Sequence, residues 1–218
     1  MKSIILIHGC HIQAGEWESI MFGTLKSPGR VPRAIEESIN QGATFIFWGS
    51  GLGYGEGVIE SNYTFEYATT KKLGFLSDYL KMQSQDLLNY LNQISVFDSK
   101  STNTFEEVQE AFQKCKEQNI DQLFLVSSPT HIARCLQNAC KLKYQTGSSI
   151  KVYGVPCDTS FANSTPADVV IFEPPHREDL PKIPLHKTLQ GVFPLLKDTK
   201  IATDFNEALK KLIQEYQS

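Results

Sequence analysis

Short apolar runs alternate along this chain with longer segments in which apolar residues recur at helical spacing. The short runs are mainly apolar, without a strict alternation of apolar and polar positions. That pattern is typical of strands that are buried on both faces of a parallel sheet. The predicted strands are Ser3–Ile7, Ala43–Trp48, Ile94–Phe97, Gln122–Ser127 and Ile150–Val155.

The segments between these runs begin with residues that cap helices. Asn103 followed by Glu106, or Thr104 followed by Glu107, fits a capping box. Helices that connect successive parallel strands indicate an α/β fold, and we expect a Rossmann-like three-layer sandwich with a mostly parallel sheet and helices on both faces. The predicted helices are Val31–Asn40, Tyr63–Lys72, Asp78–Asn92, Phe105–Gln118, Ile132–Leu142 and Phe205–Tyr216, the last of them capped by Thr203 or Asp204.

The length of 218 residues suits one domain over the whole chain. Two segments within it are unusual as connections. Glycine occupies every second position of Gly49–Gly57, and Glu173–Pro181 opens a proline-rich stretch that contains His176 and Arg177. Because long loops without secondary structure are often functional, we expect both at the surface near the site, the first as a loop that closes over a ligand or as a disordered loop. The second is a lid or a solvated strap.

Composition narrows the range of partners. The net charge is -3, so no positive field exists to attract nucleic acid or anionic lipid. The five cysteines are odd in number and form no C-x-x-C pair, which predicts reduced thiols. The apolar run at Ile4–Ile7 is too short for a signal peptide or a membrane span, so we expect a cytoplasmic protein.

The sharpest local motif is a buried strand that ends in hydroxyl groups and turns directly into a helix, at Leu125–Arg134. Such a turn points free amides and the positive end of the helix dipole at a ligand above the sheet. Arg134 would bind a phosphate or carboxylate, and His131 would transfer protons. The alternative is that Ser128 or Thr130 only caps the helix.

Other motifs are less specific. The segment Asp98–Glu107 is either a helix cap or a ligand site. The glycine run is neither a dinucleotide fingerprint nor a P-loop. His8, Cys10 and His11 could hold a metal, but no fourth ligand is evident, so we expect none. An α/β-hydrolase is excluded because Ser50 lacks the glycine that its elbow requires two residues earlier.

Three blocks resemble the YdcF-like domain of unknown function, the family of SanA and ElyC, over about residues 1–156. They are Gly29–Ala34 followed by Gly49–Gly51, then Ser101–Glu107, which resembles S-x-N-T-x-E-N, and Ser128–Arg134, which resembles S-x-x-H-x-x-R. The sequence departs from the family at Glu107, where the family has asparagine. The resemblance implies that polar side chains converge at the strand ends and that S-adenosylmethionine is a possible ligand. The site residues that it implies are Asn103, Thr104, Glu106, Ser128, His131 and Arg134, with Arg30 and Gly51.

These patterns lead to two main hypotheses of function. The first is a hydrolase or transferase that binds a small anionic substrate, such as one that carries a phosphoryl group or a nucleotide, with His131 and Glu106 as the groups that transfer protons. The second is a non-catalytic module that binds S-adenosylmethionine or a nucleoside. A third possibility is an interaction protein with a vestigial pocket.

Overall fold

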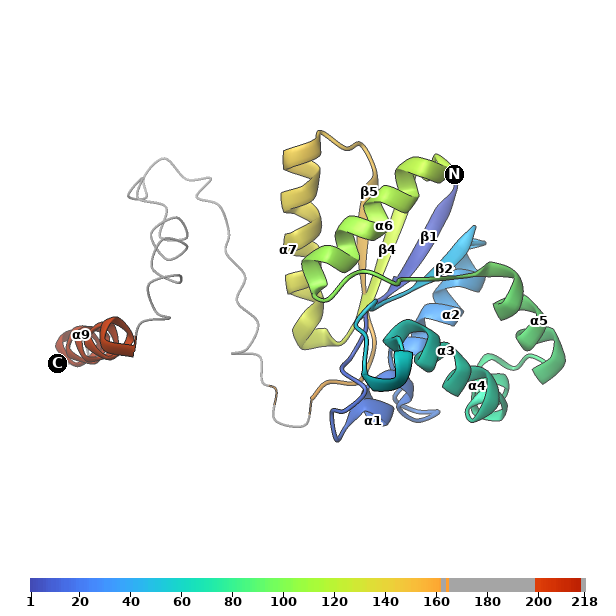
Figure 1. Cartoon of the computed structure of the whole chain (residues 1–218), viewed down its shortest axis with the longest axis horizontal. Helices are drawn as coiled ribbons and strands as arrows, with labels where there is room; N and C mark the ends of the chain where they lie inside the picture. Colours follow the sequence, from blue (N-terminus) through green and yellow to red (C-terminus); the bar gives the residue numbers. More distant parts are fainter. Residues whose placement is uncertain (162–163, 165–198, 217–218) are drawn as a thin grey trace. The chain divides into compact units, whose positions relative to one another are not determined.

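Five parallel strands form one sheet in the order β3-β2-β1-β4-β5 (Figure 1). β1 and β4 lie in the middle and are almost wholly buried, as their uninterrupted apolar sequences predict. The predicted α/β class and Rossmann-like arrangement are confirmed. The strands are β1 (Ser3–Ile7), β2 (Phe45–Trp48), β3 (Ser95–Phe97), β4 (Gln122–Ser127) and β5 (Lys151–Pro156).

Helices cover both faces of the sheet and make two separate hydrophobic cores. Ile5 and Ile7 of β1 face one core, and Ile4 and Leu6 face the other, because successive side chains of a strand point to opposite faces. The first core contains residues of α1 (Trp17–Phe22), α2 (Arg30–Gln41), α3 (Glu60–Thr70), α4 (Leu73–Leu80) and α5 (Ser84–Ile94). The second contains residues of α6 (Thr104–Gln118) and α7 (Pro129–Thr146).

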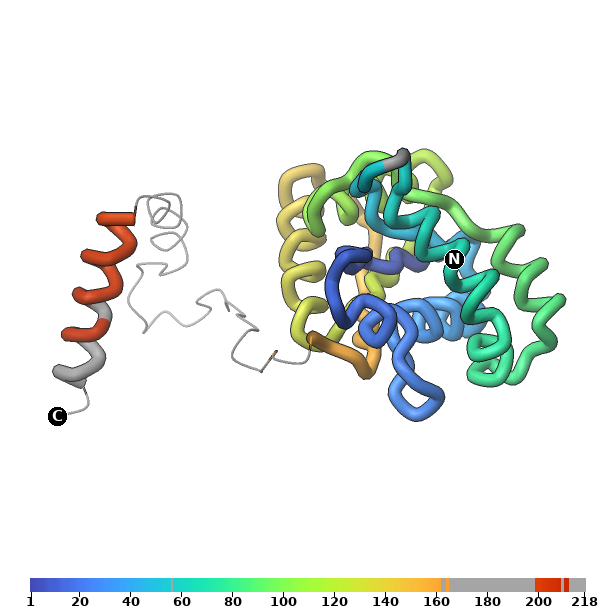
Figure 2. The backbone as a smooth tube through the Cα atoms, turned by 60° about the horizontal axis from the view of Figure 1, so that its bottom comes forward, coloured from blue at the N-terminus to red at the C-terminus, as the bar shows by residue number. Residues whose placement is uncertain are grey.

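The long connection between β2 and β3 differs from the prediction. The sequence pattern predicted one helix over Asp78–Asn92, but α4 ends before Lys81, which has a left-handed backbone, and α5 starts at Ser84. The hydrophobic periodicity continues across the break, so it could not show where the backbone turns. The helix α1 was not predicted, since six residues are too few for a periodic pattern. Figure 2 shows α4 and α5 in succession on one side of the domain, with α7 on the opposite side.

The computed structural model describes residues 1–161, 164 and 199–216. Contacts divide the chain into two units, Met1–Val170 and Ile171–Ser218; the expectation of one domain stays a prediction. In the second unit, α9 (Thr199–Tyr216) starts before the predicted cap, so Thr203 and Asp204 lie inside the helix. The proline-rich stretch with His176 and Arg177 lies outside the described residues. Within the described part of the chain, no helix has the length and apolarity needed to cross a membrane.

Candidate functional site

A cavity of about 520 Å³ opens at the carboxyl ends of β1 and β4. These two strands are adjacent in the sheet, and the chain leaves them toward opposite faces, β1 toward α2 and β4 toward α7. In open α/β sheets, ligands bind at this point, where the strand order reverses. The lining residues that matter below follow β1 or belong to α2, α6 and α7: Gly9, Cys10, His11, Arg30, Thr104, Thr130, His131 and Arg134.

Arg30 is the first residue of α2, and its guanidinium lies at the floor of this cavity although only 2% of the residue is exposed. Its Nε and one terminal nitrogen donate to the Ser128 hydroxyl, at 3.1 and 3.0 Å. The other terminal nitrogen donates to the backbone carbonyls of His8, at 3.1 Å, and Gly9. All these acceptors are neutral, and within the described residues no carboxylate forms an ion pair with Arg30.

A buried ion pair lies directly below the same strand end. The Nδ1 atom of His8 is 2.6 Å from the Glu107 carboxylate, and both side chains are almost fully buried. The second Glu107 oxygen accepts the Gly9 amide at 3.0 Å. Burial lowers the pKa of His8, but Cys135 and Glu107 outweigh it and raise the pKa to about 10. At neutral pH, the His8 ring is therefore an imidazolium that faces the Glu107 side chain.

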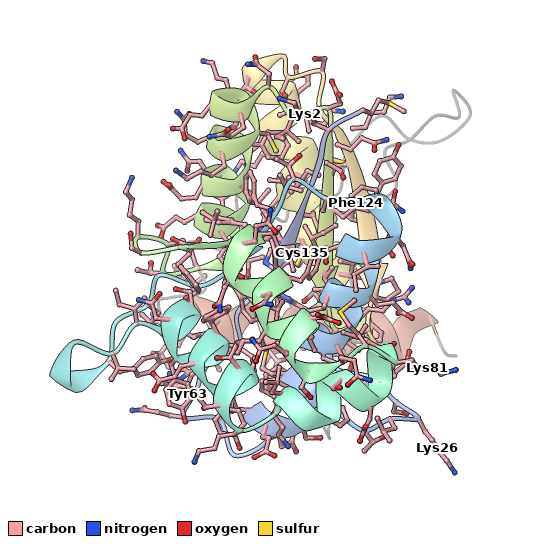
Figure 3. The ribbon with its side chains drawn as sticks, turned by 90° about the vertical axis from the view of Figure 1, so that its right-hand side faces the viewer. Lys2, Lys26, Tyr63, Lys81, Phe124 and Cys135 are labelled. Atoms are coloured by element: carbon pink, nitrogen blue, oxygen red, sulfur yellow. The ribbon has the colours of Figure 1, made fainter. Side chains whose placement is uncertain are left out.

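His131, at the start of α7, has both ring nitrogens within hydrogen-bond distance of neighbours. Its Nδ1 is 2.8 Å from the Ser127 hydroxyl, and its Nε2 is 3.1 Å from the Thr104 hydroxyl. Burial lowers the pKa of His131 to about 3, helped by the positive charges of His8, Arg30 and Arg134. The ring is therefore neutral at neutral pH and acts as a hydrogen-bonding group. Cys135, one turn further, lies inside the domain (Figure 3), with its sulfur 3.5 Å from Nδ1 of His131.

A second cavity of about 190 Å³ adjoins the first and shares Gly9, His11 and Thr104 with it. Its lining includes two buried carboxylates, Glu60 and Glu107. The first cavity therefore contains the arginines Arg30 and Arg134, and the second contains the two glutamates.

The structure brings five of the eight predicted site residues to the first cavity or its floor. Arg30, Thr104, His131 and Arg134 line it, and the Ser128 hydroxyl binds Arg30.

The other three predicted residues do not line the first cavity. Asn103 caps α6 by accepting the Glu106 amide at 3.1 Å, and it also lines the second cavity. The Glu106 carboxylate accepts the amide and the hydroxyl of Thr102, at 2.8 and 2.9 Å, so the helix-cap interpretation is confirmed for this pair. Gly51 packs against the backbone of Lys100, where a side chain would collide. A role for Glu106 in proton transfer stays a prediction.

Sequence reasoning missed the buried carboxylates. Glu107 was noted as a possible partner of Thr104 in a capping box and as a departure from the family pattern. Glu60, in the first turn of α3, looks like an ordinary helix-start acid. His8 was considered as a metal ligand. Within the described residues, however, no group of three or more His, Cys, Asp or Glu side chains could hold a metal, since His8 faces Glu107 and the His11 ring faces Tyr54.

Comparison with known proteins finds no matching family model, no matching curated protein and no matching solved structure. The site itself is therefore the basis of the functional conclusions below.

Proposed function

We propose that the chain binds a small anionic metabolite, one that carries a phosphoryl group or a nucleotide, and acts on it as a hydrolase or transferase. The single observation that carries this proposal is the buried Arg30. A guanidinium removed from water costs several kcal/mol unless it is compensated by an anion. Its position on a cavity means that a bound anion would supply that compensation.

Three further features support an anionic ligand. Arg134 adds a second positive charge on the lining of the cavity. The Ser128 side chain makes no capping hydrogen bond to α7. Pro129 has no amide hydrogen and the His131 amide donates to the Ser128 carbonyl, so the Thr130 amide is the first-turn donor at the positive end of this helix. The cavity volume of about 520 Å³ fits a small molecule. The resemblance to the YdcF-like family, which includes the segments around Arg30 and Arg134, agrees with this location of the site.

One observation favours the second candidate, a non-catalytic module for S-adenosylmethionine or a nucleoside. His131 was predicted to transfer protons, yet its pKa of about 3 and its two hydrogen-bond partners make it a recognition residue. In an enzyme, another group must therefore move the proton.

Thermal unfolding of the wild type and of Arg134→Ala, against a panel of nucleotides, sugar phosphates and S-adenosylmethionine, tests the proposal. A ligand at about 100 times its dissociation constant adds roughly 2.7 kcal/mol, which is several degrees in Tm. We expect a phosphoryl compound to stabilise the wild type but not Arg134→Ala. Lys141→Ala is the control, because Lys141 is on the same helix but packs on Phe105.

The stabilising compound is then incubated with the wild type and followed for consumption. Turnover supports the enzyme, and binding without turnover supports the second candidate. If no compound shifts the Tm of the wild type, or if Arg134→Ala responds as the wild type does, the proposed anion site is wrong.

A further inference from the structure

The second cavity contains a buried carboxylate that the fold does not explain. Only 2% of Glu60 is exposed, and its Oε1 atom is buried without a hydrogen-bond partner among the described residues. Buried polar atoms are nearly always hydrogen-bonded, so an unpartnered carboxylate oxygen requires a reason.

The orientation of Glu60 suggests that reason. Its Oε1 atom lies so close to Gly9 that a Cβ there would collide with it, and Gly9 lines both cavities. Gly9 and Glu60 line the second cavity together, so a ligand that extends from Arg30 across Gly9 would lie beside Glu60.

The other oxygen of Glu60 belongs to a chain of hydrogen bonds that leads to solvent. The Tyr54 hydroxyl donates to Oε2 of Glu60 at 3.2 Å and is 2.9 Å from Nδ1 of His11. His11 is exposed and its ring packs against that of Tyr54. Tyr54 belongs to the glycine-rich loop, so this loop contributes a hydrogen-bonding side chain beside the second cavity.

We propose that Glu60 is the residue that exchanges a proton with the bound ligand, and that Tyr54 and His11 connect it to solvent. This inference rests on the proposed function and identifies its acid–base group. Each step moves one proton: Glu60 gives its carboxyl proton to a ligand atom, Tyr54 reprotonates Glu60, His11 reprotonates Tyr54, and water reprotonates His11. The charge on the protein is thereby restored.

The electrostatic surroundings suit this role. Burial raises the pKa of Glu60, and Glu107 on α6 raises it further, whereas Tyr54, the backbone at Cys10 and Arg30 on α2 lower it. The balance gives a pKa of about 7. An acid–base group works best when its pKa lies near the working pH.

The first test needs no substrate. The infrared carbonyl band of protonated carboxyl groups is titrated in the full chain, in Glu60→Gln and in Glu110→Gln, a control at a half-buried glutamate outside both cavities. We expect one band that titrates near neutral pH in the wild type and the control and is missing from Glu60→Gln. In Tyr54→Phe, the midpoint should rise, because a donor to the carboxylate is lost; this variant also serves if Glu60→Gln fails to fold. A wild type without such a band overturns the inference.

The second test uses sulfate, which stays doubly charged near neutral pH, in calorimetric titrations with two buffers of different protonation heat. An anion beside Glu60 raises its pKa, so we expect the wild type to take up a fraction of a proton on binding. Glu60→Gln should bind sulfate without proton uptake.

The outcomes separate the two proposals. Sulfate binding without proton uptake in the wild type overturns the role of Glu60 but leaves the anion site intact. If the infrared carboxyl band titrates near neutral pH but the protein binds no sulfate, the result contradicts the proposed function. It then also contradicts the exchange of a proton between Glu60 and a ligand.

Discussion

The buried pair of His8 and Glu107 gives the most quantitative prediction. Glu107→Gln preserves the shape of the side chain but removes the negative charge that lies 2.6 Å from the imidazole. Removal of one partner of a buried ion pair typically costs about 3–5 kcal/mol, because the other charge is left uncompensated. The rise of the His8 pKa from 6.5 to about 10 corresponds to roughly 5 kcal/mol at about 1.4 kcal/mol per pKa unit. Cys135 and Glu107 both contribute to this rise, so the loss of Glu107 removes a part of this free energy.

This loss should depend on pH in a definite direction. The folded-state pKa of His8 is raised, so the stabilisation is fully present below the unfolded value of 6.5 and is lost as the pH rises through about 10. In Glu107→Gln, burial still lowers the His8 pKa and Cys135 still raises it, but the contribution of Glu107 is lost, so the folded-state pKa falls below its wild-type value. The difference in unfolding free energy between wild type and variant should therefore be largest near pH 6 and should shrink toward pH 10.

Urea denaturation followed by tryptophan fluorescence measures this difference, because Trp17 and Trp48 are both buried. Glu110→Gln is the matched control on the same helix. The Glu110 carboxylate lies 3.8 Å from Nζ of the exposed Lys100, and a surface pair of this kind contributes about 0–1 kcal/mol. A loss below about 1 kcal/mol for Glu107→Gln near pH 6, or an equal loss at both pH values, would show that His8 and Glu107 do not form an ion pair.

Two further predictions concern packing and thiol access. In Gly49→Ala, the new Cβ would lie 2.6 Å from the Glu107 carboxylate and 2.9 Å from the Ile7 carbonyl, so urea denaturation should show a loss of about 1–3 kcal/mol; an unchanged midpoint would mean that this strand end can relax. Cys140 is exposed whereas the other four cysteines are buried, so a thiol reagent should label one site rapidly in the native protein and none in Cys140→Ser; rapid labelling of a second thiol would contradict the described burial.

The strands and the location of the site could be predicted from sequence because both depend on local pattern. The run Gln122–Ser127 contains four consecutive apolar residues, Leu123–Val126, and its bounds are confirmed as those of β4. Ser128, His131 and Arg134 follow this strand directly, and the carboxyl ends of parallel strands meet at one edge of the sheet. Local order along the chain was therefore enough to place these residues together.

The partners of the buried charges could not be predicted in the same way. His8 and Glu107 are 99 positions apart, and no local pattern connects them. The sequence Asn103–Glu107 contains two adjacent glutamates, and a capping motif accounts for both equally well. Only the helical geometry shows that Glu106 turns back to Thr102 while Glu107 points under β1.

The distribution of buried charge is itself an argument for function. Away from the carboxyl edge of the sheet, the buried side chains among the described residues are aliphatic or aromatic groups, thiols and a few hydroxyls such as Ser38 and Thr64, none of them ionised. Arg30, Glu60, His8 and Glu107 are nonetheless buried together at one strand end, where each charge costs free energy that apolar residues would not. Proteins that retain such a cost commonly do so at sites where stability is traded for activity. The concentration of that cost beside the two adjoining cavities is the reason why we propose a functional site at the ends of β1 and β4.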